Sequence, residues 1–197
     1  MWKKFFGFLL LTCSLAGGVH AQFMHSVGGS VDVMYANLGP EGYQDKVTFV
    51  FKDITYFPRF NIMENATSSI SLGIPLGLGF GSVSNFSNGA TSLYFAVDAP
   101  LVADFNFGWK STADNDSRMG GYIGGGFGYR YTSFSYSDAY YGDGGFHANS
   151  YGPMVRGGVR FGLGPSTNMG MTLGLFYKMG METEKYKTIG LNILLDL

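Results

Sequence analysis

Histidine is the side chain best suited to proton transfer near neutral pH, and two histidines follow residue 21, His25 and His147. Ser137 and Ser150 flank His147 in the sequence. A serine nucleophile activated by a histidine base is the catalysis that these residue types allow. The spacing has no distinctive catalytic pattern, so we interpret the three as solvated loop residues and predict no catalytic residue.

Metal and phosphate chemistry have little support in the sequence. Cys13 is the only cysteine and precedes the predicted mature chain, so a zinc site of ordinary composition is not expected. The glycine-rich segment 121–126 continues with strand period and leads into no helix, unlike a phosphate-binding loop. Four acidic residues of the later connections lack the spacing of a calcium loop: Asp138, Asp143, Glu182 and Glu184. We predict no metal and no cofactor.

The first 21 residues have the three parts of a secretory signal. Lys3 and Lys4 form a basic start, residues 5–15 are an apolar run of eleven, and a small residue, Ala21, ends the segment. The run is too short to span a bilayer, which takes about 20 residues. Cleavage is predicted between Ala21 and Gln22, which leaves residues 22–197 as one domain.

Composition excludes several classes of protein. The chain has 31 glycines, 17% aromatic and 14% charged residues. Disordered chains avoid aromatics, and helical bundles avoid glycine. Removal of Lys3 and Lys4 leaves 11 basic and 14 acidic residues, a net charge of −3, so a nucleic-acid partner is not expected. The mature chain has no disulfide, and a closed, hydrogen-bonded barrel in a membrane is a source of stability that needs none.

Hydrophobicity after residue 22 alternates with period two, which indicates β-strands. In 119–136, Ile123, Phe127 and Tyr129 alternate with small or charged residues such as Gly124 and Arg130. Eight such segments occur, most of them longer than ten residues: 26–36, 47–62, 70–80, 93–107, 119–136, 153–163, 169–180 and 188–197. A tilted membrane strand needs about 9–11 residues.

The second segment is the least regular. Val47, Phe49 and Phe51 define its apolar face at the start, which sets Lys52 on the opposite face. The alternation is lost between Asp53 and Pro58. Because proline cannot donate to a strand ladder, we expect a β-bulge there.

The small face of the strands decides between a soluble and a membrane barrel. Glycines mixed with charges make a poor solvent surface for a β protein but suit the narrow interior of an eight-stranded ring. The sequence therefore predicts an all-β fold, an eight-stranded antiparallel up-and-down transmembrane β-barrel with a polar lumen filled by side chains. The predicted lumen residues are Asp32, Lys52, Asp98, Asp104, Arg130, Arg156, Arg160, Lys178 and Asp196.

Aromatic residues and turns predict the orientation. With the first strand leaving the periplasm, two aromatic girdles result: Tyr35, Phe95, Tyr129, Tyr131 and Tyr177 at the outer rim, and Phe105, Phe107 and Trp109 at the inner rim. The connection 136–149 then lies outside the cell. Its predicted loop residues are Asp138, Tyr140, Tyr141, Asp143 and His147.

In this pattern the chain resembles small eight-stranded outer-membrane β-barrel proteins of bacteria. The segment 188–197, a glycine followed by alternating apolar positions, looks like the assembly signal of such barrels, although Leu197 replaces the usual terminal aromatic. The resemblance implies an integral outer-membrane location, contact with lipid, and recognition of the last strand by the barrel-assembly machinery.

We predict a non-enzymatic protein that acts in membrane integrity, or in surface interaction or adhesion through its extracellular loops and a partner bound there. An outer-membrane lipid-modifying enzyme is one alternative, since some barrels of this size are such enzymes. A secreted soluble barrel that binds an apolar ligand is the other.

Overall fold

The computed structural model describes residues 22–38, 45–84, 91–112, 115, 117–138, 142–164, 169–182 and 186–197. No helix in this part of the chain is long and apolar enough to cross a membrane. The strands are β1 (Phe23–Leu38), β2 (Asp45–Glu64), β3 (Ser68–Gly73), β4 (Leu76–Ser84), β5 (Thr91–Asp98), β6 (Leu101–Gly108), β7 (Met119–Asp138), β8 (Gly142–Gly162), β9 (Gly170–Met179) and β10 (Lys187–Asp196).

These ten strands follow eight paths. β3 and β4 both pair with β2 and are separated by Ile74 and Pro75. β5 and β6 both pair with β7 and are separated by Ala99 and Pro100. Each interruption contains a proline, which has no N–H for the ladder. The eight segments predicted from the sequence correspond to these eight paths.

The sheet closes on itself. β1 pairs with β10 along one edge and with β2 along the other, and every pair of neighbours is antiparallel. The predicted all-β, antiparallel up-and-down architecture is confirmed. Where the ring is closed, each strand has a neighbour on both sides, so its backbone hydrogen bonds are satisfied within the sheet.

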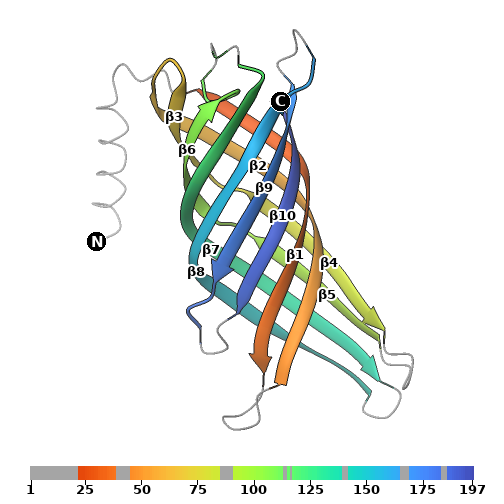
Figure 1. The fold of residues 1–197 in the computed structure, drawn as a ribbon. Coiled ribbons are helices and arrows are strands. Elements are labelled where there is room, and N and C mark those ends of the chain that lie inside the picture. Colours follow the sequence, from red (N-terminus) through yellow and green to blue (C-terminus); the bar gives the residue numbers. More distant parts are fainter. Residues whose placement is uncertain are drawn as a thin grey trace, which may run out of the picture.

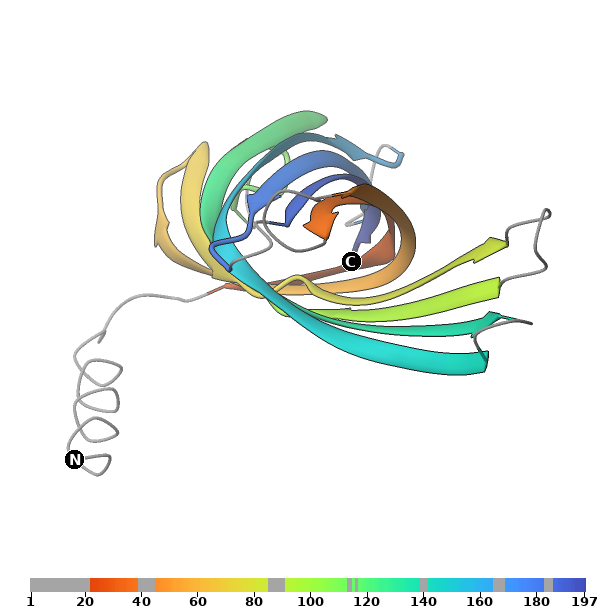
Figure 2. The same ribbon diagram turned by 90° about the horizontal axis from the view of Figure 1, so that it is seen from below.

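The two ends of the ring differ (Figure 1). The beginning of β1 and the C-terminal residue lie at one end, here called the terminal end. At the other, the hairpin end, β4, β5, β7 and β8 run past the ring and bend away together as a sheet (Figure 2). Pairing explains this: β2 contacts β4 only over Lys52–Tyr56, and β9 contacts β8 only from Met154 onward.

Side chains alternate between the interior and the outer face. In β10, Ile189, Leu191 and Ile193 are each about half exposed, whereas Asn192 and Asp196 are buried. The outer face is apolar around the ring, with Ile54, Leu93, Ile123, Val155 and Leu175 at least 60% exposed. The core of this protein is therefore the inside of the ring, and its surface is hydrophobic.

The predicted phase of β2 is wrong. Phe51 is fully buried, and Lys52, a predicted lumen residue, is exposed on the outer face. Downstream, Asp53 and Arg59 share the inward parity of Phe51. The polar residues in the second half of the strand decide its phase, whereas the prediction took the phase from the apolar start.

The bulge predicted between Asp53 and Pro58 is also wrong. β2 keeps an unbroken register with β1 from Asp45 to Phe60. The register shift lies between Asn61 and Met63, in the pairing with β3. Pro58 is accommodated because the path on the other side of β2 is interrupted at this level, between β3 and β4. There the Pro58 carbonyl accepts a hydrogen bond from Ile74 N at 3.1 Å.

The connection predicted over 136–149 is mostly strand. β7 extends to Asp138 and β8 begins at Gly142, so Asp138, Asp143 and His147 belong to strands. Tyr140 and Tyr141 lie outside the described residues. Small residues such as Gly144 and Gly145 are typical of turns, but here they belong to the paired strands of a hairpin.

Candidate functional site

The centre of the ring is crossed by a network of acidic and basic side chains around Arg130 of β7. Arg130 Nη1 lies 2.5 Å from Asp32 Oδ2 of β1, and Nη2 lies 3.1 Å from Asp53 Oδ2 of β2. Arg130 also forms an ion pair with Asp98 of β5. Lys178 Nζ of β9 lies 3.2 Å from Asp98 Oδ1. Five strands are thereby linked through one buried guanidinium.

Alternation along each strand brings these residues together. The five occupy inward positions of separate strands, and four of them are almost wholly buried, while the Asp98 side chain is 17% exposed. A buried charge is tolerated when it is paired and hydrogen-bonded. Two cations and three carboxylates meet here, so Arg130 is the residue on which the electrostatic balance of the centre depends.

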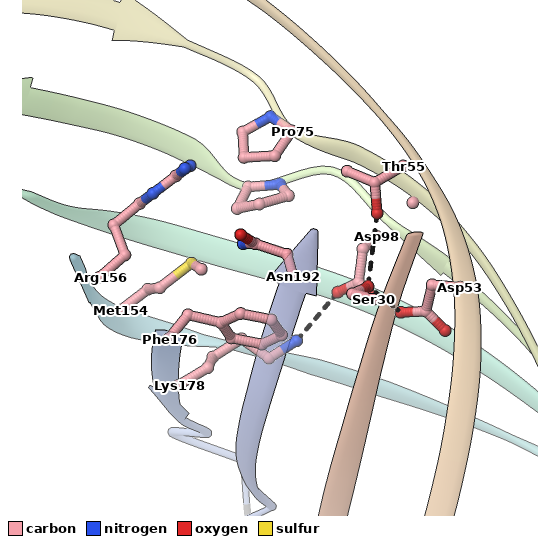
Figure 3. Close-up of a pocket in the computed structure, with 12 residues that line it drawn as sticks. Ser30, Asp53, Thr55, Pro75, Asp98, Met154, Arg156, Phe176, Lys178 and Asn192 are labelled. Carbon is pink, nitrogen blue, oxygen red and sulfur yellow. Dashed lines mark hydrogen bonds and ion pairs between the residues drawn. The ribbon is translucent and has the colours of Figure 1, made fainter. Parts of the chain in front are cut away.

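A cavity of ≈ 50 Å³ lies beside this network (Figure 3). Three residues of its wall are joined by hydrogen bonds: Ser30 Oγ lies 3.5 Å from Asp53 Oδ2 and 3.3 Å from Thr55 Oγ1. Drug-sized ligands occupy pockets of roughly 300–1,000 Å³, so this cavity suits a few waters instead. That size argues against an apolar ligand held inside the ring.

The cavity also touches the interruptions in the ring wall. Pro75 and Pro100 line it together with Gly77 and Asp98, and Pro75 lies across the cavity from Arg156 and Asn192 in Figure 3. The charged centre thus lies directly behind the two strand breaks.

Toward the hairpin end the interior becomes apolar. A buried cluster fills this region: Met34, Phe51, Tyr94, Ala96, Phe134 and Tyr186. Tyr94 Oη donates to the Val50 carbonyl at 3.0 Å, and Phe51 lies under the Arg130 guanidinium, 4.8 Å from its ring centroid. The polar lumen predicted from the sequence is therefore closed by aromatic side chains at this end.

Toward the terminal end a second set of charges surrounds Tyr122 of β7. The guanidinium carbons of Arg156 and Arg160 each lie 4.8 Å from the centroid of its ring. Arg156 Nε lies 3.6 Å from Asp104 Oδ1. Asp196 accepts hydrogen bonds from Ser26 Oγ at 2.5 Å and Thr172 Oγ1 at 2.6 Å.

Trp109, predicted for an outward girdle, instead folds into the terminal end and is 7% exposed. A Cβ built on Gly162 would lie 2.9 Å from its Nε1, so the indole occupies space left by that glycine. Lys110 Nζ lies 5.8 Å from the centroid of the Trp109 ring. Burial lowers the pKa of Lys110, and nearby Asp196 opposes that shift.

The other predicted lumen residues lie inside the ring, and Lys52 does not. Asp53, Arg59 and Asn61 are buried inside but were not predicted, because the assumed phase of β2 placed them outward. Tyr122 was also missed, although it shares the parity of Arg130. Its place in the alternation of β7 was therefore enough to predict that Tyr122 lies inside the ring.

The candidate serine–histidine pair is not assembled. Ser150 is 3% exposed and inward, whereas His147, three positions earlier, is exposed on the outer face. His147 Nδ1 lies 2.9 Å from Tyr131 Oη, and the two rings stack with centroids 5.7 Å apart. The side chain of Ser137 lies outside the described residues. Among the described residues, no group of three or more His, Cys, Asp and Glu side chains is placed to hold a metal ion.

Several solved structures are similar to this chain. Neisserial surface protein A is 15% identical, with 90% of this chain and 97% of that chain covered and a TM-score of 0.54. Ail, the attachment invasion locus protein of Yersinia pestis, solved in complex with the heparin analogue sucrose octasulfate, is 12% identical, with 88% and 99% covered and a TM-score of 0.47. The outer membrane protein OprG from Pseudomonas aeruginosa is 14% identical, with 89% and 94% covered and a TM-score of 0.46.

No family model matches the chain, and no curated protein matches it. The predicted resemblance to small outer-membrane β-barrel proteins is confirmed at the level of the fold, by the likeness to Neisserial surface protein A.

Proposed function

We propose that the chain is an integral, non-enzymatic protein of the bacterial outer membrane, a β-barrel that is filled rather than open. Its proposed role is membrane integrity, or adhesion through a partner bound at the hairpin end. The observation that carries the proposal is the reversed distribution of side chains: leucine, isoleucine and valine outside, paired charges inside. Such a surface suits lipid, and closed rings are the β structures that a bilayer accepts.

The filled interior supports a role other than diffusion of solutes. Aromatic side chains close the hairpin end, the Arg130 network crosses the centre, and Trp109 closes the terminal end. The cavity of ≈ 50 Å³ beside this network is too small to form a channel. In this proposal the filled ring acts as a rigid support for the hairpins.

The hairpin end supports the placement of the partner surface. In the proposed orientation the termini face the periplasm, and the hairpins that run past the ring face the outside (Figure 1). Ala21 lies outside the described residues, and the predicted cleavage between Ala21 and Gln22 belongs to this proposal as the route of export. The last strand, β10, completes the ring by pairing with β1, which suits its proposed recognition by the assembly machinery.

Fractionation tests the location. We expect recovery in the outer membrane, with a compact form that persists in cold SDS and changes mobility on boiling, because a closed ring is kinetically stable. Recovery as a water-soluble periplasmic or secreted protein would refute the proposal and revive the soluble ligand-binding alternative.

A tag tests the orientation and the surface role. An epitope inserted between Ala139 and Tyr140 should be labelled on intact cells, whereas one inserted at Ala66, in the turn at the terminal end, should be labelled only after permeabilisation. The reverse pattern would contradict the orientation. Adhesion to host cells or matrix is then compared between the wild type and Tyr140→Ala/Tyr141→Ala, with unchanged heat-modifiability as the control for folding.

The lipid-modifying alternative has no assembled site to support it. His147 and Ser150 lie on opposite faces of β8. A lipid profile by mass spectrometry that changes on His147→Ala substitution would favour that alternative over the non-enzymatic proposal.

A further inference from the structure

Two buried arginines inside the ring have no carboxylate partner within the described part of the chain. Arg59 of β2 is 2% exposed and Arg160 of β8 is 0% exposed. The ion pairs of the described residues involve Arg130, Arg156 and Lys178, and none involves Arg59 or Arg160. Both arginines lie in the terminal half of the lumen, beyond the cavity.

Their hydrogen bonds are also incomplete. Arg160 Nε, Nη1 and Nη2 are all buried, and none finds an acceptor among the described residues. Its guanidinium carbon lies 4.8 Å from the centroid of the Tyr122 ring. Arg59 Nη2 reaches only Met24 Sδ at 3.4 Å and the Lys110 carbonyl at 3.5 Å, and its Nε has no acceptor in the described part of the chain. Buried polar groups are ordinarily satisfied, so these donors indicate a ligand that accepts hydrogen bonds.

The charges around the two arginines indicate that this ligand is negatively charged. Arg59 and Arg160 act on each other electrostatically, and the carboxylates that act on both are Asp104 and Asp196. Asp196 already accepts hydrogen bonds from two hydroxyls, and Asp104 forms an ion pair with Arg156, at 3.6 Å, without a hydrogen bond. With Arg156 included, three guanidiniums face two carboxylates, a formal excess of one positive charge.

Water alone does not balance this arrangement. A water molecule completes the hydrogen bonds of a guanidinium but leaves its charge uncompensated, and an unpaired buried charge is strongly unfavourable. An anion supplies both the acceptors and the charge, and guanidinium groups are well suited to bind oxyanions.

We propose that the terminal half of the lumen binds a small anion between Arg59 and Arg160. The ligand is chloride or a small oxyanion such as phosphate or a carboxylate. Lys110, at the terminal end, adds a further positive charge near Arg59 and Asp196, and its Nζ donates to Leu197 O at 3.5 Å.

Thermal unfolding of the full-length mature chain in detergent tests the proposal. Sodium chloride, phosphate or acetate replaces sodium methanesulfonate, a larger and weakly binding anion, at constant ionic strength. At ten times its dissociation constant the preferred anion should raise the melting temperature by roughly 3–6 °C in a saturable manner. The anion that acts at the lowest concentration identifies the ligand.

Substitutions locate the effect. Arg160→Met should abolish the anion dependence and should be at least as stable as the wild type in methanesulfonate, because it removes an uncompensated buried charge. Lys187→Met, at the exposed start of β10, is the matched control and should keep the full response. A wild type that does not respond, or an equal response in Arg160→Met, would overturn the proposal.

A carboxylate of the chain itself is the competing occupant. Asp114 and Asp116 lie outside the described residues, so the double variant Asp114→Asn/Asp116→Asn is measured as well. If the wild type does not respond to added anions and this double variant does, the chain supplies its own anion and the proposal is wrong.

Diffraction from wild-type crystals grown in bromide gives a readout that needs no variant. An anomalous peak within hydrogen-bonding distance of the Arg160 and Arg59 guanidiniums is the expected result. Ordered water there, with no anomalous signal in bromide and no oxyanion density in phosphate, would refute the site.

Discussion

Replacement of Arg130 by methionine should strongly destabilise the folded ring. The substitution keeps most of the side-chain length and removes the cation that joins Asp32, Asp53 and Asp98. Three carboxylates then face a single remaining cation, Lys178, which contacts only Asp98. Removal of one partner from a buried pair destabilises by about 3–5 kcal/mol. We expect Arg130→Met to lose at least that much.

Urea unfolding in detergent micelles, followed by tryptophan fluorescence, measures the loss. Trp109 is buried at the terminal end and reports on the folded ring. The matched control is Lys52→Met, which removes a cation next to Asp53 in the sequence but on the outer face. It should not lower the free energy of unfolding, because a charged side chain on the lipid-facing side of a barrel is unfavourable.

The triple variant Arg130→Met/Asp32→Asn/Asp53→Asn separates charge from packing. It leaves Asp98 and Lys178 as a balanced pair, so most of the stability lost in Arg130→Met should return. A stable Arg130→Met protein, or a Lys52→Met protein that loses as much, would refute both the network and the observed phase of β2.

Three further outcomes are expected. Gly174→Val should prevent the compact, heat-modifiable form, because a Cβ there meets Tyr122 Oη and lies 2.5 Å from Asn192 Oδ1. The control Gly157→Val, on the outer face, should fold, since the nearest atom to its Cβ outside the neighbouring residues is 3.3 Å away. His147→Ala should leave the lipid profile unchanged by mass spectrometry and lower stability by less than about 1 kcal/mol, as expected for one exposed hydrogen bond. The destabilisation in Arg130→Met and the effect of Arg160→Met on unfolding should add within about 0.5 kcal/mol, because the two arginines share no ion-pair partner.

The fold was predictable because its signal repeats along the chain. Strand period two appears in eight segments, and in most of them one face is dominated by glycine and polar residues. Even the interruptions at Pro75 and Pro100 leave the parity unchanged, since Leu72, Ile74 and Leu76 all remain exposed. A period-two pattern with a consistent face predicts both strand and orientation.

The site was less predictable, for two physical reasons. In β2 both faces contain large apolar residues, Phe51 inside and Ile54 outside, so a short window does not define the phase. Inside the ring, contacts join residues far apart in sequence: Arg130 and Asp32 are separated by 98 positions. Which acidic residue meets which basic residue depends on the register of the closed sheet, and alternation alone does not contain that register.

The same closure explains the unusual composition. A ring of eight strand paths has a fixed, narrow interior, so a large inward side chain requires a small residue opposite to it. A Cβ on Gly73 would lie 2.5 Å from the Phe57 ring, and one on Gly128 would lie 2.5 Å from Lys178 Cδ. The glycines are therefore the counterpart of the arginines and aromatic rings that fill the lumen. A chain selected to conduct solutes would have no need to pair them in this way, so the glycine content supports the proposal of a filled ring.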